Sequence, residues 1–254
     1  MRVTIKKGTA HGTVAAPPSK SMAHRLLICA GLCRGKSVIR GVECSQDVLA
    51  TLDCLRAIGA KCELAGDTVT VYGTDFAESG KRTLNCRESG STLRFFIPIS
   101  MLFSGKTRLC GSETLLSRPL DVYKSICRAA GLPYKQGVDF VEVGGRLAPG
   151  NFKIPGNISS QFISGLLFAL PLLSGDSLIT IAPPIESRSY IELTLGALKK
   201  FGVEAYWKNE RTLFVAGGQS YKCADVTVEA DYSINRAVGT SRSRYRVFRR
   251  HRCR

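Results

Sequence analysis

The stretch SKSMAHRLLICAGLCRG, residues 19–35, opens with serines, continues as an apolar helical run and ends at a glycine. The same design recurs twice, as SGSTLRFFIPISMLFSG at residues 89–105 and as SSQFISGLLFALPLLSG at residues 159–175. The final glycines are 70 residues apart in both intervals. A fixed period indicates an internal repeat, so the fold is expected to contain three copies of one unit.

Each copy continues in the same way after its glycine. A short β-rich segment follows, and then a second amphipathic run closes at Gly59, Gly131 or Gly202, as expected for a helix with a C-cap glycine. Each copy finishes with the pattern of a β-hairpin. These hairpin segments are CELAGDTVTVYG (62–73), PYKQGVDFVEVGG (133–145) and EAYWKNERTLFVAGG (204–218).

The unit is therefore a βαβαββ-like module, repeated at about residues 12–75, 84–146 and 152–218. Apolar residues in the helical runs recur at helical spacing, so these helices need a surface to pack against. Three such units bury most apolar surface when the helices pack inside and small sheets lie outside. We expect one threefold α+β domain over residues 12–231.

The ten cysteines do not have the spacing of a metal site. The chain has no CxxC pair and no Cys/His cluster, and its histidines are His11, His24 and His251. Some cysteines lie within apolar helical runs, namely Cys29, Cys33, Cys54 and Cys127. We therefore expect buried, reduced thiols in a cytosolic protein, and no metal.

The hydropathy pattern does not favour a membrane. The N-terminus lacks the apolar run of a secretory signal, and no stretch approaches the roughly 18 apolar residues that cross a bilayer. The expected location is the cytoplasm.

The net charge of +16 is unevenly distributed. Residues 232–254 hold eight of the 36 basic residues, all of them arginine, and none of the 20 acidic residues. Three interpretations compete: a nucleic-acid-binding arm, a disordered extension, or residues translated out of frame. The abrupt change to arginine-only basicity favours the last, so we expect no nucleic acid partner.

The polar turns that open the repeats carry the candidate chemistry. Helix N-termini expose unpaired N–H groups and a partial positive charge, so a serine turn there either caps the helix or binds an anion. In threefold register the three turns would converge on one face. Cations stand near them in the sequence, at Lys20, Arg25, Arg94, Arg118 and Arg188.

Other catalytic signatures are missing from the sequence. No Ser/His/Asp triad can be assembled around His11 or His24, and there is no GxGxxG motif. The segment PPSKSMAHR (17–25) lacks the glycines of a P-loop. The residues alone therefore predict a threefold α+β domain that binds anions.

Five motifs point to a family. They are PPSKSMAHR (17–25), ESGSTLRFF (88–96), LLSRPLD (115–121), NISSQFISGLL (157–167) and IESRSYIELTLGALKKFG (185–202). In order and spacing they resemble EPSP synthases (3-phosphoshikimate 1-carboxyvinyltransferases) over nearly all of residues 1–233. The resemblance implies one lobe of the enolpyruvyl transferase fold.

The resemblance also implies two adjoining ligand sites. Shikimate 3-phosphate would be bound by Lys20, Ser21, Arg25, Ser159, Ser160, Ser187 and Tyr190. Phosphoenolpyruvate would be bound by Lys20, Gly90, Arg118 and Gln161. Serine hydroxyls and arginine side chains suit phosphate and carboxylate oxygens. Glu88 stands where the family usually has Asn, and its carboxylate is expected to weaken the binding of phosphoenolpyruvate.

In this family phosphoenolpyruvate is protonated at its methylene carbon, the 5-hydroxyl of shikimate 3-phosphate adds to the neighbouring carbon, and phosphate is eliminated. The reaction belongs to the shikimate pathway, which leads to chorismate and the aromatic amino acids. The resemblance implies a cytoplasmic monomer without a metal or organic cofactor, which works by charge neutralisation and by closing two lobes over its substrates.

The resemblance covers only the first lobe. The segment VEADYS (228–233) resembles the family's crossing into the second lobe, which supplies the aspartate thought to act on the 5-hydroxyl and several cations that clamp phosphoenolpyruvate. Residues 1–11 would form a strand paired with that lobe. We therefore expect an N-terminal half that is inactive alone, with Lys20 as the remaining candidate for catalysis and residues 232–254 as a disordered, non-native tail.

Two alternatives stay open on the sequence. UDP-N-acetylglucosamine enolpyruvyl transferase shares the fold and reaction type, but it carries a reactive cysteine in the loop before its Arg-Pro motif, and Cys110 lies several residues too early for that role. The other alternative is a non-catalytic, anion-binding half-domain. Such a domain would either keep the recognition of shikimate 3-phosphate alone or use the basic tail to bind nucleic acid.

Overall fold

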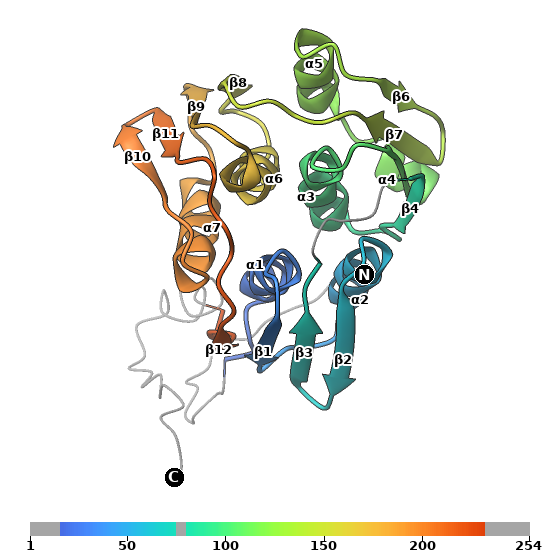
Figure 1. Cartoon of the computed structure of the whole chain (residues 1–254), viewed down its shortest axis with the longest axis vertical. Coiled ribbons are helices and arrows are strands. Elements are labelled where there is room, and N and C mark those ends of the chain that lie inside the picture. The colour runs from blue at the N-terminus through green and yellow to red at the C-terminus, as the bar shows by residue number, and fades with distance from the viewer. Residues whose placement is uncertain (1–15, 75–79, 232–254) are drawn as a thin grey trace, which may run out of the picture.

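A computed structural model of the chain describes residues 16–74 and 80–231. The predicted strand at residues 1–11 and the predicted tail at 232–254 lie outside the described residues. Three four-stranded sheets occupy three corners of the molecule and surround a group of central helices that Figure 1 shows nearly end-on. The predicted α+β class, with helices inside and small sheets outside, is therefore confirmed.

The elements follow one another in three similar units. The first contains α1 (Lys20–Gly31), β1 (Lys36–Arg40), α2 (Gln46–Ala57), β2 (Lys61–Ala65) and β3 (Thr68–Tyr72). The second contains β4 (Arg82–Asn85), α3 (Gly90–Ser100), β5 (Lys106–Cys110), α4 (Glu113–Leu116), α5 (Asp121–Ala129), β6 (Tyr134–Gln136) and β7 (Phe140–Gly144). The third contains β8 (Asn151–Pro155), α6 (Gln161–Ala169), the 3₁₀ turn η1 (Leu170–Leu172), β9 (Ser177–Ala182), α7 (Arg188–Lys200), β10 (Ala205–Asn209) and β11 (Thr212–Val215).

The three sheets share one topology. In each, a hairpin packs antiparallel against a central strand, whose other edge pairs with a parallel strand, in the orders β4-β5-β7-β6, β8-β9-β11-β10 and β12-β1-β3-β2. In the first sheet the parallel strand is β12 (Asp225–Thr227), which pairs Val38 with Asp225. The end of the described chain thus completes the unit with which it begins.

The central helices α1, α3 and α6 form the core. Beyond their first turns they are buried on nearly every side, whereas the outer helices α2, α5 and α7 bury only one face. The outer helices end before Gly59, Gly131 and Gly202, whose φ angles are 100°, 64° and 71°. These are left-handed conformations in which a side chain is unfavourable, so the predicted C-cap glycines are confirmed.

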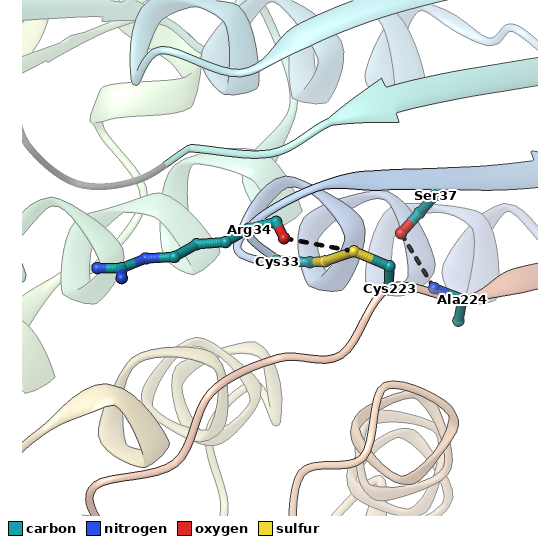
Figure 2. Close-up of a disulfide and its surroundings, with 5 residues drawn as sticks. All are labelled: Cys33, Arg34, Ser37, Cys223 and Ala224. Carbon is teal, nitrogen blue, oxygen red and sulfur yellow. Dashed lines mark hydrogen bonds between the residues drawn. A yellow bond between two sulfur atoms is a disulfide. The ribbon is translucent and has the colours of Figure 1, made fainter.

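One cysteine prediction is wrong. Cys33, expected to be a reduced thiol, forms a disulfide with Cys223, 190 residues further along, with the two Cα atoms 5.8 Å apart (Figure 2). The segment that leads into β12 carries Cys223 to the end of α1, where the Ala224 N–H donates a hydrogen bond to Ser37 Oγ. Gly35 lacks the Cβ that would lie 2.8 Å from Cys223 Sγ. The spacing of the cysteines in the sequence could not predict this disulfide, because the pairing of distant strands brings Cys33 and Cys223 together. Cys29, Cys54 and Cys127 are buried and free, as predicted.

Candidate active site

The N-terminal ends of the central helices converge on a cleft of about 450 Å³. We call it the anion cleft. All ten residues that the sequence assigned to ligand contacts line it: Lys20, Ser21, Arg25, Gly90, Arg118, Ser159, Ser160, Gln161, Ser187 and Tyr190. They come from the ends of α1, α3, α6 and α7 and from the loop after α4. The threefold convergence expected from the repeat is therefore present, while the ligand assigned to each residue stays a prediction.

Six further residues line the anion cleft, namely His24, Asp47, Glu88, Ser91, Arg94 and Phe95. The sequence had drawn attention to Arg94 as a nearby cation and to Glu88 as an extra carboxylate. The sequence did not indicate that Asp47 lines the cleft, because an aspartate in the first turn of a helix usually interacts with the helix N-terminus. His24 was considered only as a triad member, and nothing in its local sequence indicates that it faces a cleft.

Lys20 and Asp47 form an ion pair at the edge of the anion cleft. Lys20 Nζ donates to Asp47 Oδ2 over 2.7 Å. Burial alone would raise the pKa of Asp47, but the hydrogen bond and charge of Lys20, with a hydrogen bond from Ser89, bring this pKa below its usual range. Asp47 is therefore an anion that holds the lysine at the start of α1, and an incoming phosphate would compete with it for Lys20.

Arg25 is 3% exposed and joins three helices. Its Nε donates to Thr194 Oγ1 (2.8 Å), its Nη1 to the Ser21 carbonyl (2.8 Å), and its Nη2 to Ser164 Oγ (3.3 Å) and the Tyr190 carbonyl (3.1 Å). Burial lowers its pKa to about 10, so the guanidinium stays charged at neutral pH. Because an arginine has five N–H donors, the described residues leave one, on Nη1, for a ligand. Arg25 thus holds three helices together at the cleft, and one N–H group on Nη1 remains available to a ligand.

A second buried network links α1, α2 and α3 behind the cleft. His24 Nδ1 lies 2.7 Å from Thr51 Oγ1, which lies 2.9 Å from Thr92 Oγ1, and the Thr92 hydroxyl donates to Ser89 Oγ over 2.8 Å. Burial lowers the pKa of His24 to about 4, so the imidazole is neutral near pH 7. The network fixes the start of α3 relative to α1.

Gly90 and Arg118 lie in contact at the start of α3. A Cβ at Gly90 would lie 2.8 Å from Arg118 Nη1, so the glycine allows the guanidinium to approach the helix N-terminus. Beside them, Arg94 Nη1 donates to Gln161 Oε1 over 2.7 Å. Two guanidinium groups and a helix N-terminus meet at one point, which is an arrangement that attracts anions.

The serine turns divide into capping and non-capping residues. Ser19 and Ser89 accept hydrogen bonds from the N–H groups of Met22 and Thr92, as ordinary N-caps. Ser160 and Ser187 stand at the N-cap positions of α6 and α7 without a capping side-chain bond. Ser187 has a φ of 57°, a left-handed conformation that is uncommon for serine. The hydroxyls of these two residues are not used by their own helices.

Of the five cations near the serine turns in the sequence, Arg188 lies apart from the other four. It does not line the anion cleft, because its guanidinium lies 4.2 Å from the centre of the Trp207 ring and 3.6 Å from a carboxylate oxygen of Glu192. The helical register of α7 turns it toward the outer sheet. Over residues 16–74 and 80–231, the structure contains no group of three potential metal ligands, and none of its helices is long and apolar enough to cross a membrane.

A model of the EPSP synthase (3-phosphoshikimate 1-carboxyvinyltransferase) family matches residues 5–237. The chain belongs to the EPSP synthase family. The resemblance inferred from five motifs is thereby confirmed. The 3-phosphoshikimate 1-carboxyvinyltransferase of Clostridium beijerinckii is 47% identical over 238 residues, which cover 90% of this chain and 55% of that protein. The Clostridioides difficile protein of the same name is 43% identical over 236 residues, covering 87% and 54%.

Solved structures agree on the architecture. An EPSP synthase from Acinetobacter baumannii matches with a TM-score of 0.73 over 87% of this chain and 50% of that one, at 21% identity, which supports the fold alone. The chain spans about half the length of the curated relatives it matches. It therefore corresponds to one lobe of the EPSP synthase fold.

Proposed function

We propose that this chain provides the shikimate 3-phosphate site, and part of the phosphoenolpyruvate site, of an EPSP synthase. Seven residues would bind shikimate 3-phosphate: Lys20, Ser21, Arg25, Ser159, Ser160, Ser187 and Tyr190. Four would bind phosphoenolpyruvate: Lys20, Gly90, Arg118 and Gln161. The single observation that supports this assignment most strongly is that all of them line one cleft, although they come from segments far apart in the sequence.

The chemistry of the cleft fits two anionic substrates. Non-capping serine hydroxyls suit the oxygens of a phosphate monoester, and Arg118 and Lys20 suit the phosphate and carboxylate of phosphoenolpyruvate. In the proposed reaction the enolpyruvyl group passes to the 5-hydroxyl of shikimate 3-phosphate and phosphate leaves. This chain would bind and orient the reactants, with Lys20 as its candidate for catalysis.

Turnover is expected to need a second lobe. Because the chain spans about half of its relatives, the groups that act on the 5-hydroxyl and complete the clamp on phosphoenolpyruvate would have to come from residues other than those described. We therefore expect the 254-residue chain to bind shikimate 3-phosphate without catalysing the reaction, as an anion-binding half-domain would. A cytoplasmic location and a monomeric state are part of this proposal and rest on the family alone.

Calorimetric titration with shikimate 3-phosphate tests the proposal. The full 254-residue chain is expected to bind it, and Ser21→Ala and Ser160→Ala are each expected to weaken binding by about tenfold, because each removes a hydroxyl from a charged acceptor. Ser104→Ala is the matched control, since Ser104 is exposed and does not line the anion cleft.

Circular dichroism would first show that each variant is folded. The absence of binding by a folded parent chain would refute the proposal. Equal affinities for the parent chain, Ser21→Ala and Ser160→Ala would place the ligand elsewhere. Product formation by the purified chain above a vector-only control would instead refute the expectation that it is inactive alone.

A further inference from the structure

A second hollow, of about 980 Å³, lies beside the anion cleft. It runs along α5, from Pro119 to Ala130, and faces the segment Leu147–Pro155 and the turn before α6. We call it the apolar groove, because apolar side chains dominate its lining, among them Val122, Ile126, Leu147, Phe152, Ile158 and Phe162. Its volume is in the range of sites that bind small organic molecules, about 300–1,000 Å³.

The groove arises from unequal helix packing around the threefold centre. Gly165 lets α3 and α6 approach closely, since a Cβ there would lie 2.5 Å from the Arg94 carbonyl oxygen. The outer helix α5 reaches this junction through Tyr123, whose hydroxyl donates to the carbonyls of Arg94 (2.6 Å) and Phe162 (3.2 Å). With nine residues, α5 is also shorter than α2 with 12 and α7 with 13. Space therefore remains between α5 and the start of β8.

The apolar groove and the anion cleft adjoin. Arg94 and Ser159 line both. The Arg94 guanidinium lies 5.0 Å from the centre of the Phe162 ring, and its Nε is buried without a hydrogen-bond partner among the described residues. Burial lowers the pKa of Arg94, so an anion beside it would stabilise its charged form. A cation thus stands at the junction of a polar and an apolar compartment.

We propose that the cleft and the groove together form one elongated site for an amphipathic organic phosphate, with its phosphate among the serines and arginines and a neutral aryl or alkyl tail along α5. The recognition of the phosphate rests on the function proposed above. Asp121 and Lys153 both line the groove and carry opposite charges, so the groove beyond Arg94 has no net charge to favour a charged tail. Because most of the lining is apolar, burial of a hydrocarbon tail provides the added affinity.

The test compares 4-phenylbutyl phosphate with methyl phosphate, by calorimetric titration of the full 254-residue chain. The tailed phosphate is expected to bind at least about tenfold more tightly, since even partial burial of a phenyl ring has this effect. Excess shikimate 3-phosphate is expected to displace it, because the two would share the phosphate position. Binding that is no tighter than that of methyl phosphate would overturn the proposal. So would the failure of shikimate 3-phosphate to displace 4-phenylbutyl phosphate from a chain that binds shikimate 3-phosphate on its own.

Gly150→Phe provides a variant that blocks the groove. Gly150 lines the groove, a Cβ there would meet no atom within 4 Å, and its φ is not in the left-handed region, so the substitution is not expected to strain the backbone. It should abolish the advantage of the tail and leave methyl phosphate unaffected. Gly196→Phe is the matched control: this glycine in α7 is equally unobstructed and does not line the groove.

The possible outcomes distinguish a failure of the elongated site from a failure of the proposed function. Normal binding of shikimate 3-phosphate with no advantage of the tail refutes only the elongated site. A tail advantage that Gly150→Phe leaves unchanged also refutes it, because the tail would lie elsewhere. Tight binding of 4-phenylbutyl phosphate by a chain that does not bind shikimate 3-phosphate would refute the proposed function instead.

Discussion

At the scale of single residues, the charge of the anion cleft depends on Glu88. This exposed carboxylate lines the cleft together with Lys20, Arg94 and Arg118. It lowers the positive potential that an incoming dianion meets, although solvent screens much of the effect. Glu88→Gln keeps the shape of the side chain and removes the charge. We expect it to tighten phosphoenolpyruvate binding by about three- to tenfold in calorimetric titration at low salt.

Glu210→Gln controls for the change in net charge. Glu210 is exposed in the turn between β10 and β11 and does not line the cleft. It should leave the affinity unchanged, and the advantage of Glu88→Gln should shrink as salt is added. Weaker binding by Glu88→Gln would mean that the carboxylate supports the site rather than opposing the ligand.

His24 makes stability depend on pH. Its pKa is about 4 in the folded chain, mainly because of burial and despite the attraction of Asp47, against 6.5 for an unperturbed histidine. Well above pH 6.5 the imidazole is neutral in both states. As the pH falls below 6.5, the unfolded chain takes up a proton that the folded chain excludes. The free energy of unfolding should therefore fall, by about 2 kcal/mol at about pH 5 from this group alone.

His24→Gln tests this, since the amide can still bond to Thr51 but does not titrate. Urea unfolding between about pH 7 and pH 5 should show a shallower loss of stability in the variant than in the parent chain. Parallel pH profiles would show that His24 has the same pKa in the folded and unfolded chains, and would refute the lowered pKa.

At the scale of elements, the contact between α3 and α6 depends on Gly165. A Cβ at this position would lie 2.5 Å from both the Arg94 carbonyl oxygen and the Tyr123 hydroxyl. Gly165→Ala is therefore expected to separate the two central helices and to lower the free energy of unfolding by about 1–3 kcal/mol. Gly196→Ala, in the unobstructed part of α7, should raise it by about 0.5–1 kcal/mol, because alanine favours a helix. Chemical denaturation would measure both, and equal effects would refute this account of the packing.

Most helices and hairpins could be predicted from the sequence because their signals are local. The serine N-caps, the apolar periods and the C-cap glycines all lie within the element that they define. The position of α5 could not be predicted, since it depends on the close approach that Gly165 allows. Nor could the pairing of β12 with β1, because it joins the two ends of the described chain. In the cleft, the repeat predicted the convergence of the serine turns. It could not predict that Asp47 and His24 line the cleft, because the packing of α1 against α2 determines which helix faces point there.

At the scale of the whole molecule, the Cys33–Cys223 disulfide links the end of the described chain to its first unit. Cys33 immediately precedes the turn into β1, and Cys223 immediately precedes the strand region that pairs with it. A covalent bond across 190 residues of sequence restricts the unfolded chain far more than the folded one. Cys223→Ser is therefore expected to lower the free energy of unfolding by about 2–4 kcal/mol under non-reducing conditions.

The same reasoning predicts how a reductant will change the stability of the chain. Adding a phosphine reductant should destabilise the parent chain to the level of Cys223→Ser and should leave that variant unchanged. Cys44→Ser is the matched control, because Cys44 is exposed and free, and it should keep the full response to the reductant. If the folded parent chain carries free thiols at Cys33 and Cys223 under non-reducing conditions, only non-covalent contacts hold β12 against β1, among them the backbone pairing and the Arg40–Asp225 ion pair. The parallel edge of the first sheet would then be expected to open more readily than those of the other two sheets, because β12 has three residues whereas β4 has four and β8 has five.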